Sequence, residues 1–313
     1  MTLNGVGVGR ARVLFIFLDG VGLAPPGRHN PLSCVPMPRL KNLLGGPLVC
    51  NGATVPAVKV GASSRDVVVR ALDACLGVPG LPQSATGQAA LFTGVNAPRL
   101  VGGHVTAFPT AQLRELLAEQ SLLRQAAEAG GRVLFANAHS ELFWQMVHER
   151  RRHLGASTLT ALAADAPIPT LTDLVEGRAL LWDITHEIAT GHLGYDLPIV
   201  SAVEAGRRLT RLAAEYDLVL FETFMPDLAG HQRLEPEWVL TRLDAFLGSI
   251  LDHLTPNVTL VVCSDHGNIE DASTKAHTTN PVPLLACGPG ATRFRSANAI
   301  TDVAPTILSL LEG

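Results

Sequence analysis

The sequence lacks the features of a disulfide-stabilised or membrane-spanning protein. Its five cysteines are odd in number, widely spaced and without a C-x-x-C pair. This excludes a regular disulfide framework or a cysteine zinc site and favours free thiols in a reducing compartment. No apolar run approaches the length of a membrane helix, and the run 13–18 ends at Asp19 without a signal-peptide cleavage site. We therefore expect a soluble cytoplasmic protein that does not contact a membrane.

Excess positive charge is also absent. The net charge is -4 and the arginines form no long basic block, so the composition gives no reason to expect nucleic acid as a partner. Hydrophobic residues make up 47% of the 313 residues. A chain of this size can bury a sizeable core, either as one large domain or as a core with a second, inserted module.

What the sequence does contain is an alternation of apolar runs and amphipathic stretches. Five short apolar runs, each followed by turn residues, predict buried parallel strands: 13–18, 132–137, 217–223, 258–263 and 282–287. Apolar spacing of three and four predicts helices over 110–131, over 201–216 with Ser201 as its cap, and over 301–313 with Thr301 or Asp302 as its cap. This order indicates an α/β fold with a mostly parallel sheet and helices on both faces.

The middle of the chain has a different character. From about residue 98 to residue 194 it is richer in charge, and it separates the first third of the strands from the last. We therefore predict a catalytic core formed by residues 1–98 and 200–313, with residues 99–199 inserted as a smaller cap domain. Caps of this kind close over a site and exclude water.

Polar side chains follow three of the predicted strands. Asp19 follows the first, Asp227 and His231 follow the strand 217–223, and Asp265 and His266 follow the strand 258–263. An aspartate after one strand is often only a turn or cap residue. Ligands of open α/β sheets bind beyond the carboxyl ends of the strands, so three such strand ends together indicate a functional site.

These residues and one further histidine form a set of candidate metal ligands. One turn of the D-x-x-G-H segment would bring Asp227 and His231 toward the same ion, and His277 lies twelve residues after Asp265. Three carboxylates and three imidazoles are more than one tetrahedral ion needs, and they suit two divalent ions such as manganese or zinc. The predicted ligands are Asp19, Asp227, His231, Asp265, His266 and His277.

A serine in the stretch 81–94 is the candidate nucleophile. Gly87 and the small residues around Ser84 predict a tight loop that leads into a helix, and backbone N–H groups at a helix N-terminus favour an anion. A divalent ion would lower the pKa of the Ser84 hydroxyl. Alternatively, Ser84 is an ordinary N-cap residue. The loop lacks the G-K-[ST] ending of a Walker loop and is not a G-x-S-x-G elbow.

Six segments resemble, in the same order, the signature segments of cofactor-independent phosphoglycerate mutase. They are FLDGVG, LGVPGLPQSATGQ, PDLAGH, SDHGNIED, AHTTNPVPLL and TDVAPTIL. That enzyme is a member of the alkaline phosphatase superfamily of metalloenzymes, which also contains phosphopentomutase. The resemblance covers roughly the first and the last hundred residues, and it implies an alkaline-phosphatase-like sheet core.

The resemblance also implies roles for the matching residues. Ser84 would be the phosphorylated serine and would surround one ion together with Asp19, Asp265 and His266, whereas Asp227, His231 and His277 would hold the other. The implied enzyme is a phosphomutase that uses a phosphoserine intermediate on a small phosphorylated metabolite. The alternatives are a phosphomonoesterase of the same superfamily and a metal-binding relative without catalysis. The oligomeric state stays open.

The departures from the family's pattern concern the substrate. The mutases carry a histidine where this chain has Gln88, and their inserted domain is about twice as large and contains a G-G-V-H-S-H segment that is missing here. Cap arginines are candidates for binding an anionic substrate: Arg99, Arg150, Arg151, Arg152 and Arg178. Four residues beside the motifs are interpreted as structural rather than phosphate-binding: Asn268, Lys275, Thr278 and Asn280.

Overall fold

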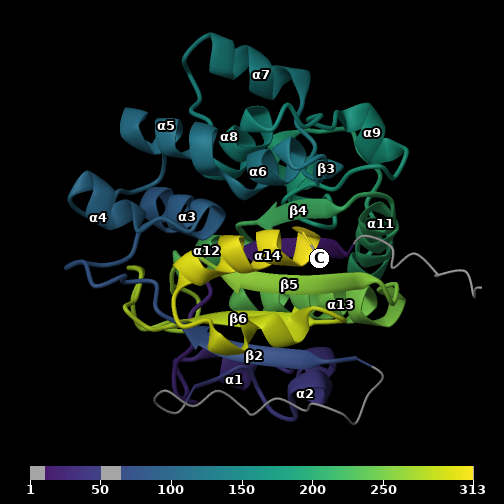
Figure 1. The fold of residues 1–313 in the computed structure, drawn as a ribbon. Coiled ribbons are helices and arrows are strands. Elements are labelled where there is room, and N and C mark those ends of the chain that lie inside the picture. The colour runs from purple at the N-terminus through teal and green to yellow at the C-terminus, as the bar shows by residue number, and fades with distance from the viewer. Residues whose placement is uncertain (1–10, 51–64, 313) are drawn as a thin grey trace, which may run out of the picture.

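The computed structural model describes residues 11–50 and 65–312, and it is built around one six-stranded sheet (Figure 1). The strand order is β2–β6–β5–β1–β4–β3. The strands are β1 (Arg12–Leu18), β2 (Val67–Leu72), β3 (Val133–Phe135), β4 (Leu218–Thr223), β5 (Val258–Ser264) and β6 (Val282–Cys287). β3, β4, β1 and β5 run parallel, and β6 runs opposite to both of its neighbours.

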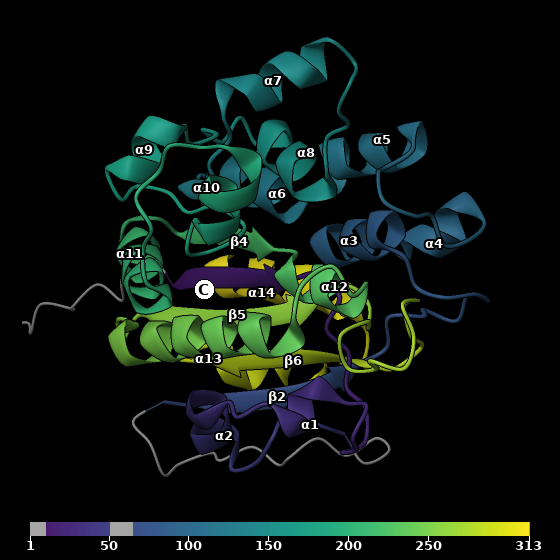
Figure 2. The same cartoon turned by 180° about the vertical axis from the view of Figure 1, so that it is seen from behind.

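Helices cover both faces of this sheet, as the two opposite views show (Figures 1 and 2). The first face carries α3 (Ser84–Thr93), α5 (Ala111–Gln120), α6 (Leu122–Glu128), α8 (Ala156–Ala163), η1 (Ala291–Ser296), η2 (Ile300–Asp302) and α14 (Val303–Glu312). The second carries α1 (Pro31–Cys34), α2 (Pro38–Leu44), α11 (Ala202–Glu215), α12 (Met225–Gly230) and α13 (Pro236–His253). α4 (Ala97–Val101) follows α3, and α7 (Glu141–His148), α9 (Leu171–Val175) and α10 (Glu187–Leu193) lie beyond β3.

The central strand shows why the apolar runs are continuous rather than alternating. Along β1, Val13, Phe15 and Phe17 pack into the core on one face of the sheet. Leu14, Ile16 and Leu18 pack into the core on the other face. A strand that is buried on both faces needs apolar side chains at every position. The predicted fold class, an α/β protein with a mostly parallel sheet covered on both faces, is therefore confirmed.

One predicted strand direction is wrong, and one strand was missed. The strand 282–287 was expected to be parallel, but β6 pairs antiparallel with β5. A parallel return needs a crossover connection of a dozen or more residues, usually a helix, and the 265–281 segment between the two strands contains no helix or strand. β2 (Val67–Leu72) is also an apolar run and forms the edge of the sheet next to β6.

The helix predictions differ from the structure mainly at their ends. The helix over 110–131 divides into α5 and α6 at Ser121, whose backbone is extended. Ser201 caps α11 as predicted, because its side chain accepts a hydrogen bond from the N–H of Glu204. The last helix begins at Val303, and the Asp302 carboxylate accepts instead from the N–H groups of Asn298 and Ala299, at the start of η2.

The division into a core and an inserted cap stays a prediction. β3, which lies within the predicted cap range 99–199, pairs with β4 in the main sheet, and α5, α6 and α8 from that range pack against the first face. A separate small cluster joins the segments around α9 and α10: Ala138, Leu174, Ala179, Leu181, Ala189 and Leu197. The predicted core range includes residues 1–10 and 51–64, which lie outside the described residues.

Within the described ranges, no helix has the length and apolarity needed to span a membrane.

Candidate metal centre

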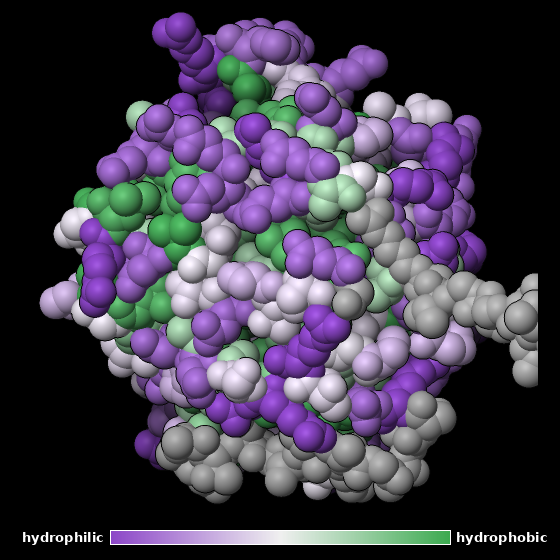
Figure 3. All heavy atoms as spheres, viewed as in Figure 1, coloured by the Kyte–Doolittle hydropathy of each residue, from purple (hydrophilic) through white to green (hydrophobic). Residues whose placement is uncertain are grey.

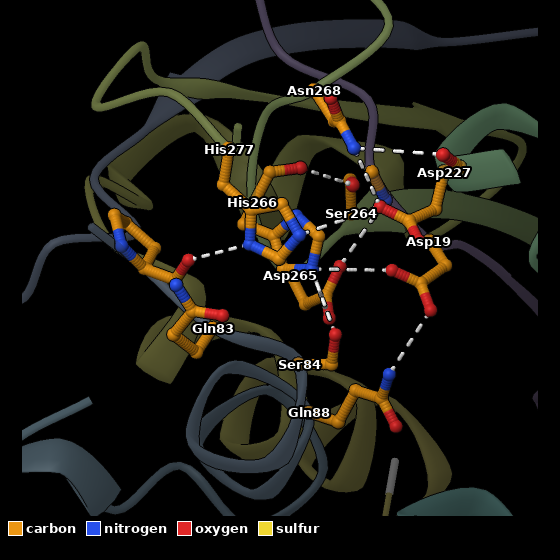
Figure 4. Close-up of polar contacts among 12 residues, drawn as sticks. Asp19, Gln83, Ser84, Gln88, Asp227, Ser264, Asp265, His266, Asn268 and His277 are labelled. Carbon is orange, nitrogen blue, oxygen red and sulfur yellow. Dashed lines mark hydrogen bonds and ion pairs between the residues drawn. The ribbon is translucent and has the colours of Figure 1, made fainter. Parts of the chain in front are cut away.

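The predicted ligands meet at the carboxyl edge of the sheet, where β1, β4 and β5 end (Figure 4). They form two groups in which one ligand atom from each residue lies within 4.8 Å of the others. The first group is Asp19, Asp265 and His266, and the second is Asp227, His231 and His277. The parallel strands bring together residues that are more than 200 positions apart in the sequence.

The first group surrounds the side chain of Ser84. Its Oγ lies 3.1 Å from Nε2 of His266. The same nitrogen lies 3.3 Å from Oδ1 of Asp19 and 3.5 Å from Oδ2 of Asp265. Ser84 is the first residue of α3, and Gln83, not Ser84, is the N-cap. The hydroxyl therefore lies at the N-terminus of a ten-residue helix, as the sequence predicted, and is not used to cap it.

The second group lies beside the first. Nε2 of His231 is 3.3 Å from Oδ2 of Asp227, one helical turn away on α12. Nε2 of His277 is 3.6 Å from Oδ1 of Asp227 and 3.4 Å from Nε2 of His231. The rings of His266 and His277 are stacked with centroids 3.7 Å apart, which places the two groups side by side.

Backbone carbonyls orient two of the histidines. Nδ1 of His277 lies 2.9 Å from the carbonyl of Pro82, and Nδ1 of His231 lies 2.7 Å from the carbonyl of Lys275. A histidine whose Nδ1 is bonded to a carbonyl keeps Nε2 available, and this is the usual arrangement of a metal-ligating imidazole. Both Nε2 atoms face Asp227, so these three side chains present their ligand atoms to one point.

Burial shifts the protonation equilibria of the first group strongly. The pKa of Asp19 is raised well above its usual range by burial and then by the carboxylates of Asp265 and Asp227. The pKa of Asp265 is raised by burial and by Asp227, whereas burial and the neighbouring His277 lower the pKa of His266. A cluster of carboxylates in a buried site carries charge at low cost only when a cation neutralises it.

The donor set fits two divalent cations. Oδ1 of Asp19 and Oδ2 of Asp265 are buried and accept no hydrogen bond within the described part of the chain. Unsatisfied buried carboxylate oxygens next to a neutral imidazole are the ligands that manganese and zinc accept. The absence of cysteine from either group distinguishes the site from a structural zinc site.

Glycines allow the motifs to approach each other this closely. Gly20 has φ +76, and a Cβ there would lie 2.8 Å from Cα of Asp227. A Cβ on Gly87 would lie 2.9 Å from the carbonyl oxygen of Asp265, so α3 can place Ser84 against the first group only with glycine at this position. A Cβ on Gly230 would collide with Asn268 at 2.3 Å.

The sequence reasoning missed Glu270, which holds the loop after β5 in place. Its carboxylate is 1% exposed and accepts hydrogen bonds from the N–H of Gly22 at 2.9 Å and of Asn268 at 2.8 Å. It also accepts from the side chains of Thr278 and Asn280. These contacts agree with the interpretation of Thr278 and Asn280 as structural residues, which stays a prediction. The sequence did contain a signal for Glu270, because in the SDHGNIED stretch this acid follows the candidate ligand His266 by four residues.

Gln88 and Asn268 contact the carboxylates directly. The amide of Gln88 donates to Oδ2 of Asp19 at 3.3 Å, and the amide of Asn268 donates to Oδ1 of Asp227 at 2.9 Å. A hydrogen bond to one carboxylate oxygen fixes the orientation of the other. Gln88 thus orients Asp19.

A cavity of about 740 Å³ opens above both groups. Ser84, Asp227, His231 and His277 lie at its base. Its other walls come mostly from the middle of the chain, including α7, and also contain Glu222, Phe224 and Arg233. Of the cap arginines predicted as anion-binding candidates, Arg152 lines the cavity, and Arg233, which was not predicted, lines it as well.

Comparison with known proteins places this chain in a family. The model of the metalloenzyme superfamily matches residues 11–312. The 2,3-bisphosphoglycerate-independent phosphoglycerate mutase of Syntrophotalea carbinolica is 33% identical over 136 residues, which cover 40% of this chain and 26% of the mutase. The corresponding mutase of Paracoccus denitrificans is 35% identical over 149 residues, covering 44% and 28%. The matched part thus spans about a quarter of the length of these relatives.

Solved structures with little sequence identity have the same fold. The PH0037 protein from Pyrococcus horikoshii aligns over 97% of this chain and 98% of its own, with a TM-score of 0.56 and 14% identity. The alkaline phosphatase from the Antarctic bacterium TAB5 aligns over 97% and 98%, with a TM-score of 0.50 and 13% identity. The predicted alkaline-phosphatase-like core is therefore confirmed.

Proposed function

Since the chain belongs to the metalloenzyme superfamily, we propose that it is a phosphoryl-transfer enzyme in which Ser84 carries the phosphoryl group between donor and acceptor. The observation that supports this most is the position of the Ser84 hydroxyl. It lies at the N-terminus of α3, 3.1 Å from His266 and at the base of a cavity large enough for a substrate. The N–H groups of the first turn of α3 favour an anion at this position.

The residues proposed to hold the two ions are those of the two groups. Asp19, Asp265 and His266, together with Ser84, would hold one divalent ion, and Asp227, His231 and His277 would hold the other. When bound, the ions supply positive charge that stabilises the attacking and leaving oxygens of an in-line phosphoryl transfer. Gln88 and Asn268 keep the carboxylates oriented for this role.

The proposed reaction has two balanced steps. Oγ of Ser84 forms a bond to phosphorus while the bond from phosphorus to the ester oxygen breaks, and the leaving oxygen keeps that electron pair. The proton of the Ser84 hydroxyl ends on the leaving oxygen, so an alcohol and a phosphoserine result. In the second step an acceptor hydroxyl attacks phosphorus, its proton returns to Oγ of Ser84, and the phosphoserine is converted back to serine.

The acceptor distinguishes a mutase from a phosphatase. We propose a phosphomutase, because the cavity above Ser84 is large enough to retain the dephosphorylated product until a second hydroxyl of that product attacks. Hydrolysis is the second candidate. Part of the cavity wall is open to solvent, since Phe108 and Leu142 are 46% and 56% exposed, and water can therefore reach the phosphoserine.

Trapping the intermediate tests the proposal. Manganese-loaded and zinc-loaded protein is incubated with a panel of phosphate monoesters, quenched in acid and digested, and the peptide containing Ser84 is analysed for phosphate by mass spectrometry. We expect phosphate on Ser84, and none in Ser84→Ala, whose turnover should fall at least about 10³-fold. Full turnover by Ser84→Ala would contradict the mechanism. Phosphorus NMR of the products then separates isomerised ester from free phosphate.

A further inference from the structure

We infer that the group esterified to the transferred phosphate is large and largely apolar, with an aromatic ring or a similarly planar part, and is not a small polyhydroxylated acid or sugar. The inference rests on the proposed function, because it concerns the ester whose phosphate reaches Ser84. It is drawn from the walls of the cavity above the two ligand groups, which take no part in the steps described so far.

The cavity holds an unusual share of the aromatic residues of the chain. The sequence contains only ten Phe, three Trp and two Tyr, and five of these fifteen residues line the cavity: Phe108, Phe143, Trp182, Tyr195 and Phe224. Cavities of this size that bind small molecules are lined mainly by hydrophobic and aromatic side chains matched to the ligand. A glycerate would leave most of this wall in contact with water.

Helix α7 supplies an apolar face that the described part of the protein covers only in part, with the Phe143 ring edge-on to His139 at a centroid distance of 4.2 Å. None of its residues is buried, although Leu142, Phe143 and Met146 lie on it and line the cavity. Hydrophobic residues also reach the surface beside α4 and α5 and next to α7 (Figure 3). An amphipathic helix normally buries its apolar face. Here that face borders the cavity that contains Ser84, which identifies the occupant as an apolar part of the substrate.

Three polar side chains of the same wall, those of Ser140, Tyr195 and Asn137, already have hydrogen-bond partners within the protein. Oγ of Ser140 lies 2.9 Å from the hydroxyl of Tyr195. The amide of Asn137 makes two hydrogen bonds, one to the backbone carbonyl and one from the backbone N–H of Glu222. A binding site for a sugar or glycerate needs free donors and acceptors for the hydroxyl groups, because unpaired polar groups of a buried ligand are costly. These side chains are not free for that purpose.

The aromatic wall is held in place before any ligand binds. The rings of Trp182 and Phe224 are stacked with centroids 4.1 Å apart and an interplanar angle of 16°. The segment that follows Trp182 has two residues other than glycine with left-handed backbone, Ile184 at φ 61 and His186 at φ 66. Such strain is sustained only where the surrounding structure over-determines it and is typical of ligand-binding segments. The wall is therefore a formed surface.

Binding of two phosphonates provides a test that does not depend on turnover. Phenylphosphonate and methylphosphonate have the same anionic group and differ in the ring, and neither can transfer its phosphorus group. We expect phenylphosphonate to bind manganese-loaded protein at least about tenfold more tightly by calorimetry, because the ring removes apolar wall from water. Equal dissociation constants would overturn the inference.

Two variants test whether the cavity wall causes the preference for phenylphosphonate. Phe143→Ala should remove most of the preference for phenylphosphonate, whereas Ile199→Ala, at a position 55% exposed that does not line the cavity, should retain it. Loss of the preference in Ile199→Ala to the same degree would contradict the assignment of the wall. Thermal unfolding of both variants checks that they are folded.

Turnover distinguishes a failure of this inference from a failure of the proposed function. We expect kcat/KM for hydrolysis of phenyl phosphate, in which water accepts the phosphoryl group from Ser84, to exceed that for hydrolysis of 3-phosphoglycerate and of ribose 5-phosphate at least about tenfold. The opposite order, with phosphate still found on Ser84, would overturn the inference and leave the proposed function intact. A preference for phenylphosphonate without phosphate on Ser84 from any ester would overturn the proposed function and support the apolar occupant.

Discussion

The two walls of the cavity differ in almost every physical property. Directly behind the base, against the cavity-lining Asp19 and Ser84, Asp265 and His266 are fully buried, polar and close together. They come from the end of a core strand. On the opposite side, Leu142 and Phe108 are apolar and about half exposed. Charged groups are thus buried and large apolar groups are exposed, which is the reverse of the usual distribution in a folded protein.

This reversal indicates that each wall requires a bound group: a cation at the base and an apolar ligand on the opposite side. Buried carboxylates in which one oxygen accepts no hydrogen bond need a cation, and a largely exposed apolar helix face needs an apolar partner. We call the side opposite the base the upper wall; it includes Phe108, Leu142, Phe143, Arg152, Trp182 and Phe224. The base therefore determines the chemistry, and the upper wall determines which ester is accepted. The two walls should respond differently to substitution, and the following experiments test that difference.

The largest effect is expected when a carboxylate of the base is neutralised. Asp265→Asn should lower turnover at least about 10³-fold and reduce the bound metal, because it removes one charged ligand. Without metal, the same substitution should stabilise the protein, since it removes a buried carboxylate that lies next to Asp19 and Asp227. Metal analysis and thermal unfolding with and without a chelator measure both effects.

Metal removal from the unmodified protein should show the matching pH dependence. The pKa values of Asp19 and Asp265 are raised in the folded state. In the metal-free protein, their contribution to stability should therefore be complete below the ordinary pKa of an aspartate and should be lost as the pH rises. Asp252→Asn, on the surface beside Arg39, serves as the control. If Asp265→Asn and Asp252→Asn unfold at the same temperature in chelator, repulsion between the buried carboxylates does not cause the loss of stability.

The second-largest effect on stability is expected for Glu222, which lines the cavity. Burial raises its pKa to about 7. Stability from the protonated side chain is complete below pH 4.5 and is lost as the pH rises through 7. Glu222→Gln should therefore be more stable than the unmodified protein at pH 8.5 by about 3 kcal/mol and similar to it at pH 4.

Denaturant unfolding of the metal-free proteins at several pH values provides the measurement. Glu215→Gln, on the exposed side of α11, is the matched control and should change stability much less at either pH. A difference between Glu222→Gln and the unmodified protein that is independent of pH would show that Glu222 does not titrate in this range.

A smaller effect separates two adjacent arginines of the upper wall. Arg152 lines the cavity and its guanidinium lies 5.1 Å from the centre of the Phe143 ring, whereas Arg151 pairs with Glu149 at the surface. Arg152→Gln should raise KM for a phosphate ester about tenfold with little change in kcat, since it removes a cation that binds the anionic substrate. Arg151→Gln should leave both constants unchanged. Steady-state kinetics that show equal effects would contradict the placement of Arg152 in the substrate wall.

The sequence was sufficient to predict the base of the cavity. Asp19, Asp227 and Asp265 each follow an apolar strand, and the carboxyl ends of parallel strands meet at one edge, so their proximity follows from local patterns. The direction of β6 was not predictable in this way. An apolar run has the same pattern in both directions, and the direction depends on whether the preceding loop crosses over or turns back.

The upper wall was not predicted, because its residues share no pattern. Phe143 lies on an amphipathic helix, Trp182 lies in a segment with left-handed backbone, and Phe224 follows a strand. Each resembles an ordinary core residue in the sequence, and only the fold shows that they face one cavity. For the same reason Arg152 could not be distinguished from its neighbours, and Glu270, which organises the loop after β5, was missed.

The smallest effect is expected at the start of α9, a helix that contributes only Leu171 to the lining of the cavity. Thr170 and Asp173 form a capping box at its start, and the pKa of Asp173 is lowered to about 2, first by its hydrogen bonds with Thr170 and then by Arg178. The lowered pKa means that this stability is present above pH 3.8 and is lost as the pH falls toward 2. Because the carboxylate is partly exposed, Asp173→Asn should lower the free energy of unfolding at pH 7 by only about 1 kcal/mol. Denaturant unfolding at pH 7 and pH 2.5 measures this loss, and a loss of the same size at both pH values would show that the charge of Asp173 does not contribute to the cap.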